Sequence, residues 1–348
     1  MAAPLIISDQ RDRPDQQEIV IMLADFSFTP PEQIFAELKK GSNMAGGSPS
    51  NPASMKGVGQ PATAAMSAPG MAMSGVATAP DLNDVKYDAF LANDRTLADP
   101  EVVKVEPGGR VLLRIINSSS MSAYHLELGQ LDGELIAVDG FRIAPVVARR
   151  FPIAVAQRLD IRLTIPRAPA AYPVLAVLEG ESRQTGIILQ AAGAPIARIP
   201  DNASTASPAL TLDLERRLRA AEPLKPRKAD RVHTLNLTGE MAGYVWSINN
   251  VAWNKDVPPL PLAAGERVEL IFVNKTPMPH PMHLHGHEFQ VVEIDGKRFP
   301  GAVRDTVLVP PGRRVVVAFD DNNPGLWSIH CHLLYHLDAG MFTTLGYV

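Results

Sequence analysis

The chain has 348 residues, enough for two domains of ordinary size, and its 33 basic against 37 acidic side chains leave a formal net charge of −4. This balance, without any cluster of Lys and Arg, gives no sign of a nucleic-acid partner. The single cysteine, Cys331, excludes an internal disulfide and a cysteine-rich zinc site. No apolar run is long enough for a membrane span, and the N-terminal sequence lacks the basic head and apolar stretch of a signal peptide.

The first 80 residues are predicted to hold one strand, one helix and one insertion. Residues 17–26 have the pattern of a strand, and residues 30–40 that of a short helix with proline at its start. Residues 41–80 are rich in Gly, Ser, Ala and Pro and almost uncharged, a composition that cannot bury a core. We therefore predict a disordered insertion there.

The rest of the chain is predicted to be all-β. From about residue 84 to 190, and again from 232 to 348, short apolar runs alternate with turn residues. Between them, the sequence LTLDLERRLRAAEPL predicts an amphipathic helix. We assign residues 1–194 to a first domain, 195–231 to a linker with a short helix, and 232–348 to a second domain.

The two β segments repeat each other at a spacing of roughly 155 residues, which indicates two related barrels in tandem and is far too long for a solenoid unit. EPGGRVLLRIINSS matches AAGERVELIFVNKT, and AQRLDIRLTIP matches PGRRVVVAFDD. The alignment compares the histidines of the second copy with their counterparts in the first: His283 and His285 align with His125 and Glu127, and His330, Cys331 and His332 align with Leu175, Ala176 and Val177. The first copy has the barrel without the metal-binding side chains.

Seven of the nine histidines lie between residues 280 and 336, in the segments HPMHLHGH and HCHLLYHLDAGM. Because alternate side chains of a strand point to opposite faces, Cys331 points away from His330 and His332. The thiolate and the two imidazoles can then ligate two different metal centres only a few bonds apart. His283 and His285 also share one face, so they can join His330 and His332 in a histidine-only site.

On its own face, Cys331 is followed by His336 and Met341, and His280 is the natural second imidazole. One Cys, two His and a weak axial Met are the donors of a blue-copper electron-transfer site. A lone histidine in a barrel is usually a hydrogen-bonded core or surface residue, but two interlocking clusters at this spacing rarely arise by chance. Zinc also binds His and Cys, yet it does not explain a cysteine bracketed by histidines that face another site.

HPMHLHGH and HCHLLYHLDAGM resemble the two C-terminal copper signatures of the multicopper oxidases, a family that includes laccases, cuprous oxidases and copper-resistance oxidases. The resemblance extends over nearly the whole chain and implies tandem cupredoxin-like Greek-key β-barrels. It assigns four ligands to type 1 copper: His280, Cys331, His336 and Met341. It assigns His283 to type 2 copper, and His285, His330 and His332 to the type 3 pair. The segment from APLIISD through the predicted helix looks most like the copper-resistance-type oxidases of bacteria.

The resemblance also implies a part that this sequence does not encode. Members of the family reduce dioxygen at three coppers held by eight histidines, and four of these come from two His-x-His pairs in an N-terminal cupredoxin domain. No such pair lies before residue 280. APLIISD resembles the segment that closes that barrel in relatives, so we expect the family's N-terminal cupredoxin domain, with its two His-x-His pairs, to be missing from this chain.

The activity implied by the resemblance is a copper-dependent oxidation. A phenol, an aromatic amine or Cu(I) would give single electrons to type 1 copper, and Cys331, His330 and His332 would carry them to the centre where dioxygen is reduced to water. Two alternatives remain: a non-catalytic electron-transfer protein with only the type 1 site filled, and a folded relic that binds little copper. The family resemblance implies a periplasmic or extracellular location.

Several residues near the motifs are not assigned as ligands. His287 is interpreted as a packing residue or a support for a ligand, and His125 and His233 as isolated histidines. Leu337 stands where some relatives carry a carboxylate that relays protons, and Asp338 is interpreted as an exposed residue near a turn. Five methionines in the insertion could gather Cu(I), but we favour a flexible linker with incidental methionines: Met44, Met55, Met66, Met71 and Met73.

Overall fold

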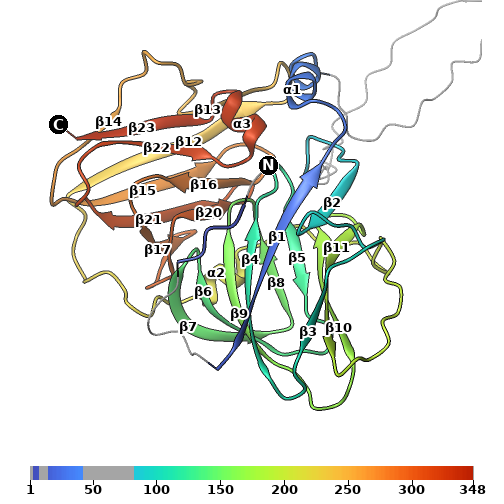
Figure 1. Cartoon of the computed structure of the whole chain (residues 1–348). Helices are drawn as coiled ribbons and strands as arrows, with labels where there is room; N and C mark the ends of the chain where they lie inside the picture. The colour runs from blue at the N-terminus through green and yellow to red at the C-terminus, as the bar shows by residue number, and fades with distance from the viewer. Residues whose placement is uncertain (1–2, 8–14, 42–81, 348) are drawn as a thin grey trace, which may run out of the picture.

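The computed structural model describes residues 3–7, 15–41 and 82–347. Within them, two β-barrels lie side by side, each made of two packed sheets (Figure 1). The predicted strand and helix near the N-terminus are confirmed as β1, Gln17–Phe26, and α1, Pro31–Lys39. The predicted insertion with its five methionines lies outside the described residues, apart from Gly41.

The first barrel holds strands β1 to β11. Its six-stranded sheet has the order β2-β1-β4-β9-β6-β7, and its five-stranded sheet the order β3-β11-β10-β5-β8. Apolar residues alternate with polar ones along strands such as β9, so one face of each sheet is buried. After β1, the bounds are β2 Ala89–Ala92, β3 Val102–Val105, β4 Arg110–Asn117, β5 Tyr124–Glu127, β6 Gly133–Val138, β7 Phe141–Ala148, β8 Arg150–Ile153, β9 Arg158–Thr164, β10 Ala171–Leu178 and β11 Gln184–Ala191.

The second barrel repeats this plan with strands β12 to β23. One sheet has the order β13-β12-β15-β21-β17-β18, with β19 paired to β17, and the other has the order β14-β23-β22-β16-β20. The bounds are β12 Arg231–Glu240, β13 Val245–Ile248, β14 Leu260–Leu262, β15 Arg267–Asn274, β16 His280–Leu284, β17 Phe289–Ile294, β18 Lys297–Arg298, β19 Val303–Arg304, β20 Thr306–Val309, β21 Arg314–Asp320, β22 Leu326–Cys331 and β23 Phe342–Tyr347.

The strand register corrects one detail of the repeat alignment. In the first barrel the cross-strand neighbour of His125 is Val177, and in the second the neighbour of His283 is His330. If His125 is the counterpart of His283, Val177 occupies the place of His330, and the aligned residue Leu175 lies two positions away. A shift of two residues keeps every side chain on the same face, so the hydrophobic pattern cannot detect it.

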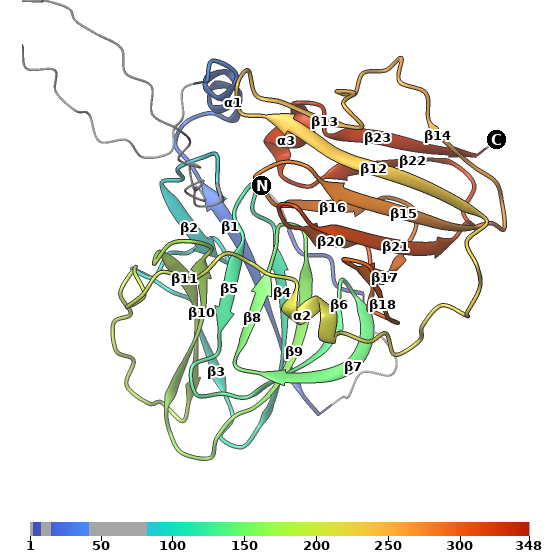
Figure 2. The same cartoon turned by 180° about the vertical axis from the view of Figure 1, so that it is seen from behind.

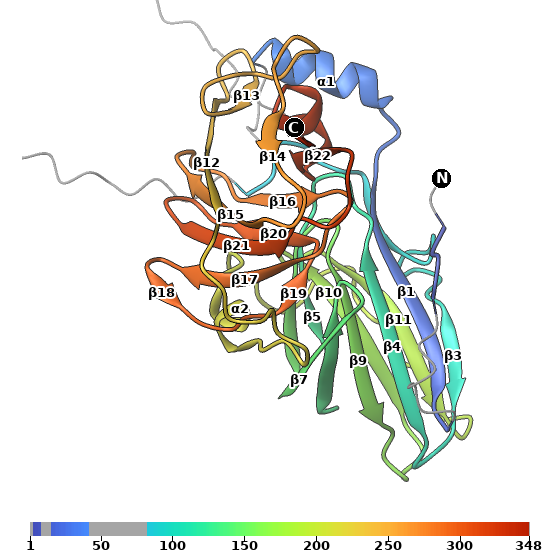
Figure 3. The same ribbon diagram turned by 90° about the vertical axis from the view of Figure 1, so that its left-hand side faces the viewer.

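Two helices connect the barrels. α1 precedes most of the first barrel in sequence but packs on the second (Figure 3). There Phe35 stacks on Tyr335 of the short helix α3, Leu334–Asp338, with ring centroids 6.1 Å apart. The predicted linker helix is shorter than its sequence pattern indicates, because α2 covers only Asp213–Arg217. It lies where the two barrels meet (Figure 2). None of the helices in the described ranges is long and apolar enough to cross a bilayer.

A buried carboxyl group of the first barrel forms a hydrogen bond with the linker. Glu179 accepts a hydrogen bond of 2.6 Å from the backbone N–H of Leu210. Burial raises the pKa of Glu179 to about 7, although the Leu210 N–H partly offsets this effect. The folded protein therefore binds a proton at Glu179 more readily than the unfolded chain does, where the pKa is about 4.3.

This raised pKa predicts how stability changes with pH. The contribution of Glu179 is fully present below pH ~4 and is lost as the pH rises through about 7. Relative to Glu179→Gln, the wild-type free energy of unfolding should fall by on the order of 3 kcal/mol between pH ~4 and ~8, measured by urea unfolding of the copper-free protein. The exposed Glu181→Gln is the control, and parallel stability curves for wild type and Glu179→Gln would contradict the prediction.

Candidate copper centres

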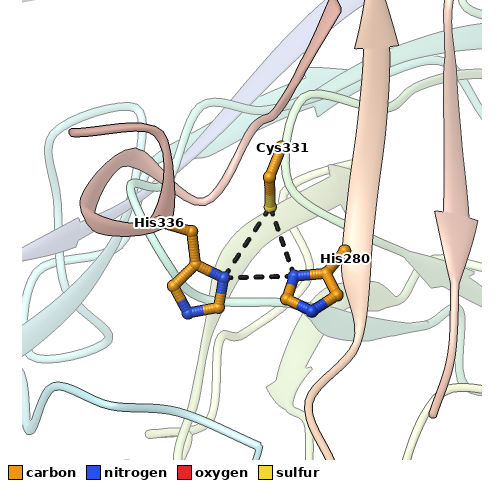
Figure 4. Close-up of side chains that lie close together, drawn as sticks. All are labelled: His280, Cys331 and His336. Carbon is orange, nitrogen blue, oxygen red and sulfur yellow. Dashed lines mark hydrogen bonds between the residues drawn. The ribbon is translucent and has the colours of Figure 1, made fainter. Parts of the chain in front are cut away.

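The two histidine motifs are brought together by one pair of antiparallel strands. β16 and β22 are neighbours in the five-stranded sheet, with Met282 opposite Cys331 and His283 opposite His330. After β22 the short helix α3, Leu334–Asp338, turns the chain so that His336 returns to Cys331 (Figure 4). The register thus sorts the potential metal ligands into two groups. One group contains Cys331, and the other contains histidines alone.

The first group is a buried triangle of donor atoms. Cys331 Sγ lies 3.6 Å from His280 Nδ1 and 3.8 Å from His336 Nδ1, and the two nitrogens are 3.2 Å apart. All three residues are completely buried. A point equidistant from the three atoms lies about 2 Å from each, which is a metal–ligand bond length. The donor set and its spacing therefore fit one metal ion.

Met341, the expected axial ligand, is joined to two residues of the triangle through its backbone. Its side chain is buried, its backbone N–H donates to the carbonyl of His336, and its carbonyl accepts from the N–H of Cys331. A thiolate with two imidazoles is the soft donor set of blue copper, often completed by a long axial Met, and it differs from the hard oxygen sets of magnesium or calcium.

Burial sets the protonation of the triangle before any metal binds. It raises the pKa of the Cys331 thiol, with a smaller contribution from the negative charge of Asp84. Burial and the neighbouring His336 hold the pKa of His280 well below its usual range. The imidazole is then neutral and ready to ligate, while a bound cation would have to displace the thiol proton.

Each imidazole of the triangle is held at the nitrogen that points away from Cys331. His280 Nε2 lies 2.7 Å from the hydroxyl of Thr276, and His336 Nε2 lies 2.9 Å from Asp84 Oδ2. Trp246 stacks on His336 with ring centroids 4.0 Å apart. These contacts leave both Nδ1 atoms for a metal. The sequence motifs did not reveal Asp84 or Trp246, because neither lies near a ligand in the chain.

The second group consists of four imidazoles that range from buried to exposed. His285 Nε2 lies 3.0 Å from His330 Nε2, and the ring of His332 lies 5.6 Å from that of His283. His330 is buried, His283 and His332 are half-buried and His285 is exposed. Burial lowers the pKa of His330 and of His332 to about 4, so both are neutral near pH 7. Neutral imidazoles that share one face can bind more than one metal ion.

Comparison with known proteins identifies the family. Residues 17–194 and 226–346 each match a model of multicopper oxidases. The chain belongs to the multicopper oxidase family. The fold agrees: the laccase from Botrytis aclada superposes on 94% of this chain and 64% of its own, with a TM-score of 0.70 at 17% identity.

Two curated multicopper oxidase relatives are similar in sequence. The multicopper oxidase MmcO of Mycobacterium tuberculosis is 33% identical over 77% of this chain and 52% of its own length. A copper resistance protein A homolog of Pseudomonas syringae pv. tomato is 25% identical over 97% of this chain and 72% of its own. The chain thus spans about half the length of the mycobacterial relative.

The remaining histidines of this multicopper oxidase lie outside both groups. His287 Nε2 lies 3.2 Å from Asp321 in the core, where its ring also packs on Phe319. His125 and His233 are each within hydrogen-bonding distance of a proline carbonyl oxygen. None of the three belongs to a cluster of potential metal ligands in the part of the chain that the structure describes.

Gly286 joins His285 to His287 in a conformation that favours glycine. Its φ is +72°, and a Cβ atom there would lie 2.1 Å from the ring of Trp327. Gly286→Ala should therefore displace the loop, weaken metal binding at His285 and destabilise the fold by more than the roughly 1–3 kcal/mol that a strained backbone costs. Gly296→Ala is the matched control, since Gly296 has φ +82° and open space around it. Equal losses in thermal unfolding would show that the Trp327 clash is unimportant.

Proposed function

We propose that this chain carries the electron-accepting centre and half of the dioxygen-reducing centre of a copper-dependent oxidase. The observation that supports this most is the covalent link between the two groups of ligands. Cys331 belongs to the buried triangle, and its chain neighbours His330 and His332 belong to the histidine group. Bound copper would supply one-electron redox chemistry in the triangle and dioxygen reduction in the histidine group.

The residues of the chain divide this work. His280, Cys331, His336 and the axial Met341 would hold the type 1 ion in a dry pocket that excludes water. His283, His285, His330 and His332 would hold half of the trinuclear site, with His283 on the type 2 ion and the other three on the type 3 pair. The backbone from Cys331 to His330 and to His332 gives electrons a short covalent path between the sites.

The electron donor is proposed to be a phenol, an aromatic amine or Cu(I). His336 is completely buried and Asp84 nearly so, and a donor docked at the surface therefore does not touch the imidazole directly. Its electron would cross the side chains that cover His336. We expect the protein to act in the periplasm or outside the cell, as the family resemblance implies.

The type 1 site should form in this chain, because all its ligands lie in one barrel. We expect an intense blue absorption after Cu(II) is added, and Cys331→Ser should abolish it while the far-UV circular dichroism stays unchanged. Thr343→Ser, a conservative change of a buried side chain of β23 that lies opposite Ile329, is the control. A Cys331→Ser protein that kept the blue band would refute the assignment.

Met341 should tune the site more than it holds the ion, because an axial thioether bond is long and weak. Met341→Leu should raise the reduction potential and leave the protein blue, as measured by a redox titration followed at the blue band. A protein that lost its copper on this substitution would instead make Met341 an essential ligand.

The histidine group offers four of the eight imidazoles that the family resemblance implies. We therefore expect about one tightly bound copper per chain, since structural metal sites need a complete ligand set. Oxygen uptake with a phenolic substrate should be absent or very slow, and should appear when a cupredoxin domain with two His-x-His pairs is supplied. Elemental analysis and an oxygen electrode test both points; four tight coppers and rapid turnover from this chain alone would overturn them. No uptake with the added domain would favour a pure electron-transfer role.

A further inference from the structure

Three consecutive residues of the second barrel, Arg304, Asp305 and Thr306, each form hydrogen bonds with the first barrel. Arg304 Nε donates to Asp139 at 3.0 Å, and Arg158 donates to both carboxylate oxygens of Asp305, at 2.7 and 2.5 Å. The carbonyl of Thr306 accepts from Gln157 at 3.4 Å, and its N–H donates to Asp139. The link between β19 and β20 is therefore held from outside its own barrel.

The same link holds one ligand of the histidine group. His283 Nδ1 lies 2.9 Å from the carbonyl oxygen of Asp305 and 3.0 Å from the hydroxyl of Thr306. The single hydrogen of that hydroxyl is donated to the Asp305 carboxylate at 2.8 Å, so the hydroxyl can only accept at Nδ1. Both neighbours of Nδ1 are then acceptors, and Nδ1 must carry the proton. A proton on Nδ1 leaves Nε2 bare, which is the form that binds a metal, and the ring lies within 4.8–5.6 Å of the other three imidazoles.

The first barrel provides an internal comparison. His125 pairs across the strands with Pro152, as His283 pairs with Thr306. Proline has no side-chain hydroxyl, and within the described residues His125 Nδ1 has no hydrogen-bond partner. Hydrogen-bond partners for the histidine Nδ1 are thus present in the barrel that carries the proposed ligands. In the described part of the other barrel, His125 Nδ1 has none.

The ion pair between Arg158 and Asp305 links Arg158 to the position of the Asp305 backbone, whose carbonyl contacts His283. Asp305 has a side chain only 21% exposed, and its two oxygens are satisfied chiefly by the Arg158 guanidinium. Removing the guanidinium leaves a largely buried carboxylate without its counter-ion, which destabilises the folded state. We expect the Asp305 side chain to turn toward water in response, and this would move the backbone carbonyl that accepts from His283.

We propose that Arg158 of the first barrel is a positioning residue for His283, acting through Asp305. The inference rests on the proposed function only in naming His283 as a copper ligand. The first barrel, which has no copper ligands of its own, would then act on the histidine group. By docking on the second barrel, it would determine which ring nitrogen of His283 carries the proton. Because Arg158 binds both Asp305 oxygens as a planar fork, lysine should replace it only in part.

The test uses the full chain, without copper and labelled with ¹⁵N-histidine. Long-range proton–nitrogen spectra report which ring nitrogen of His283 carries the proton, and the resonance is assigned by its loss in His283→Gln. The wild type should show one form, protonated at Nδ1. Arg158→Met should show a mixture of the two forms, and Arg158→Lys an intermediate result. The control is Arg162→Met on the same strand, which removes an ion pair with Glu134 inside the first barrel.

A second readout follows Cu(II) added after the type 1 site is filled. The paramagnetic resonance signal of copper on the histidine group should need roughly 10–100-fold more Cu(II) in Arg158→Met than in wild type, with an unchanged blue band. Arg162→Met should behave as wild type. If Arg158→Met fails to fold, Arg158→Lys decides.

The outcomes separate this inference from the proposed function. A missing blue band in every protein would refute the proposed function, while the spectra of the copper-free protein would still decide the role of Arg158. If no added Cu(II) binds to the histidine group, the protonation form alone decides. A single Nδ1-protonated His283 in Arg158→Met, with any Cu(II) binding within about twofold of wild type, would overturn the proposal.

Discussion

The antiparallel pairing of β16 with β22 is the constraint on which both candidate copper centres depend. It places Met282 opposite Cys331 and His283 opposite His330, so that the buried triangle and the histidine group lie on different sides of one sheet. A slip of one residue would turn every side chain of a strand to the other face and would mix the two sets of donors. The flanking strands β20 and β23 pair with β16 and β22 and help to fix this register.

Much of the fold was predictable because its patterns are local. The alternation of apolar residues and the internal repeat predicted tandem β-barrels, and the comparison with laccases confirms the fold. β1 and α1 were also predicted, since each has a clear run of residues and α1 begins at a proline. The linker helix came out shorter, as α2 ends at Arg217. Propensity favours a longer helix there, but the packing of the linker between two barrels limits it.

The grouping of the site residues was predictable for the same reason, because strand alternation and spacing within two short motifs decide which side chains can share an ion. The supporting residues were not predictable. Asp84 reaches His336 across the domain boundary, and Arg158 reaches Asp305 from the other barrel. Such contacts depend on how the barrels dock, and no periodicity in the sequence records that. The repeat alignment failed at Leu175 for a related reason, since only hydrogen bonds between strands define the register.

The buried triangle has a consequence for the speed of electron transfer. Its three ligands are shielded from water, each imidazole is fixed at its outer nitrogen, and Trp246 packs against His336. Little solvent surrounds the ion to rearrange when its charge changes, and the donor atoms are already in place before any ion arrives. A redox-active ion held in the triangle would therefore have a small reorganisation energy. An electron could then pass through the site at a useful rate even when donor and acceptor differ only slightly in potential.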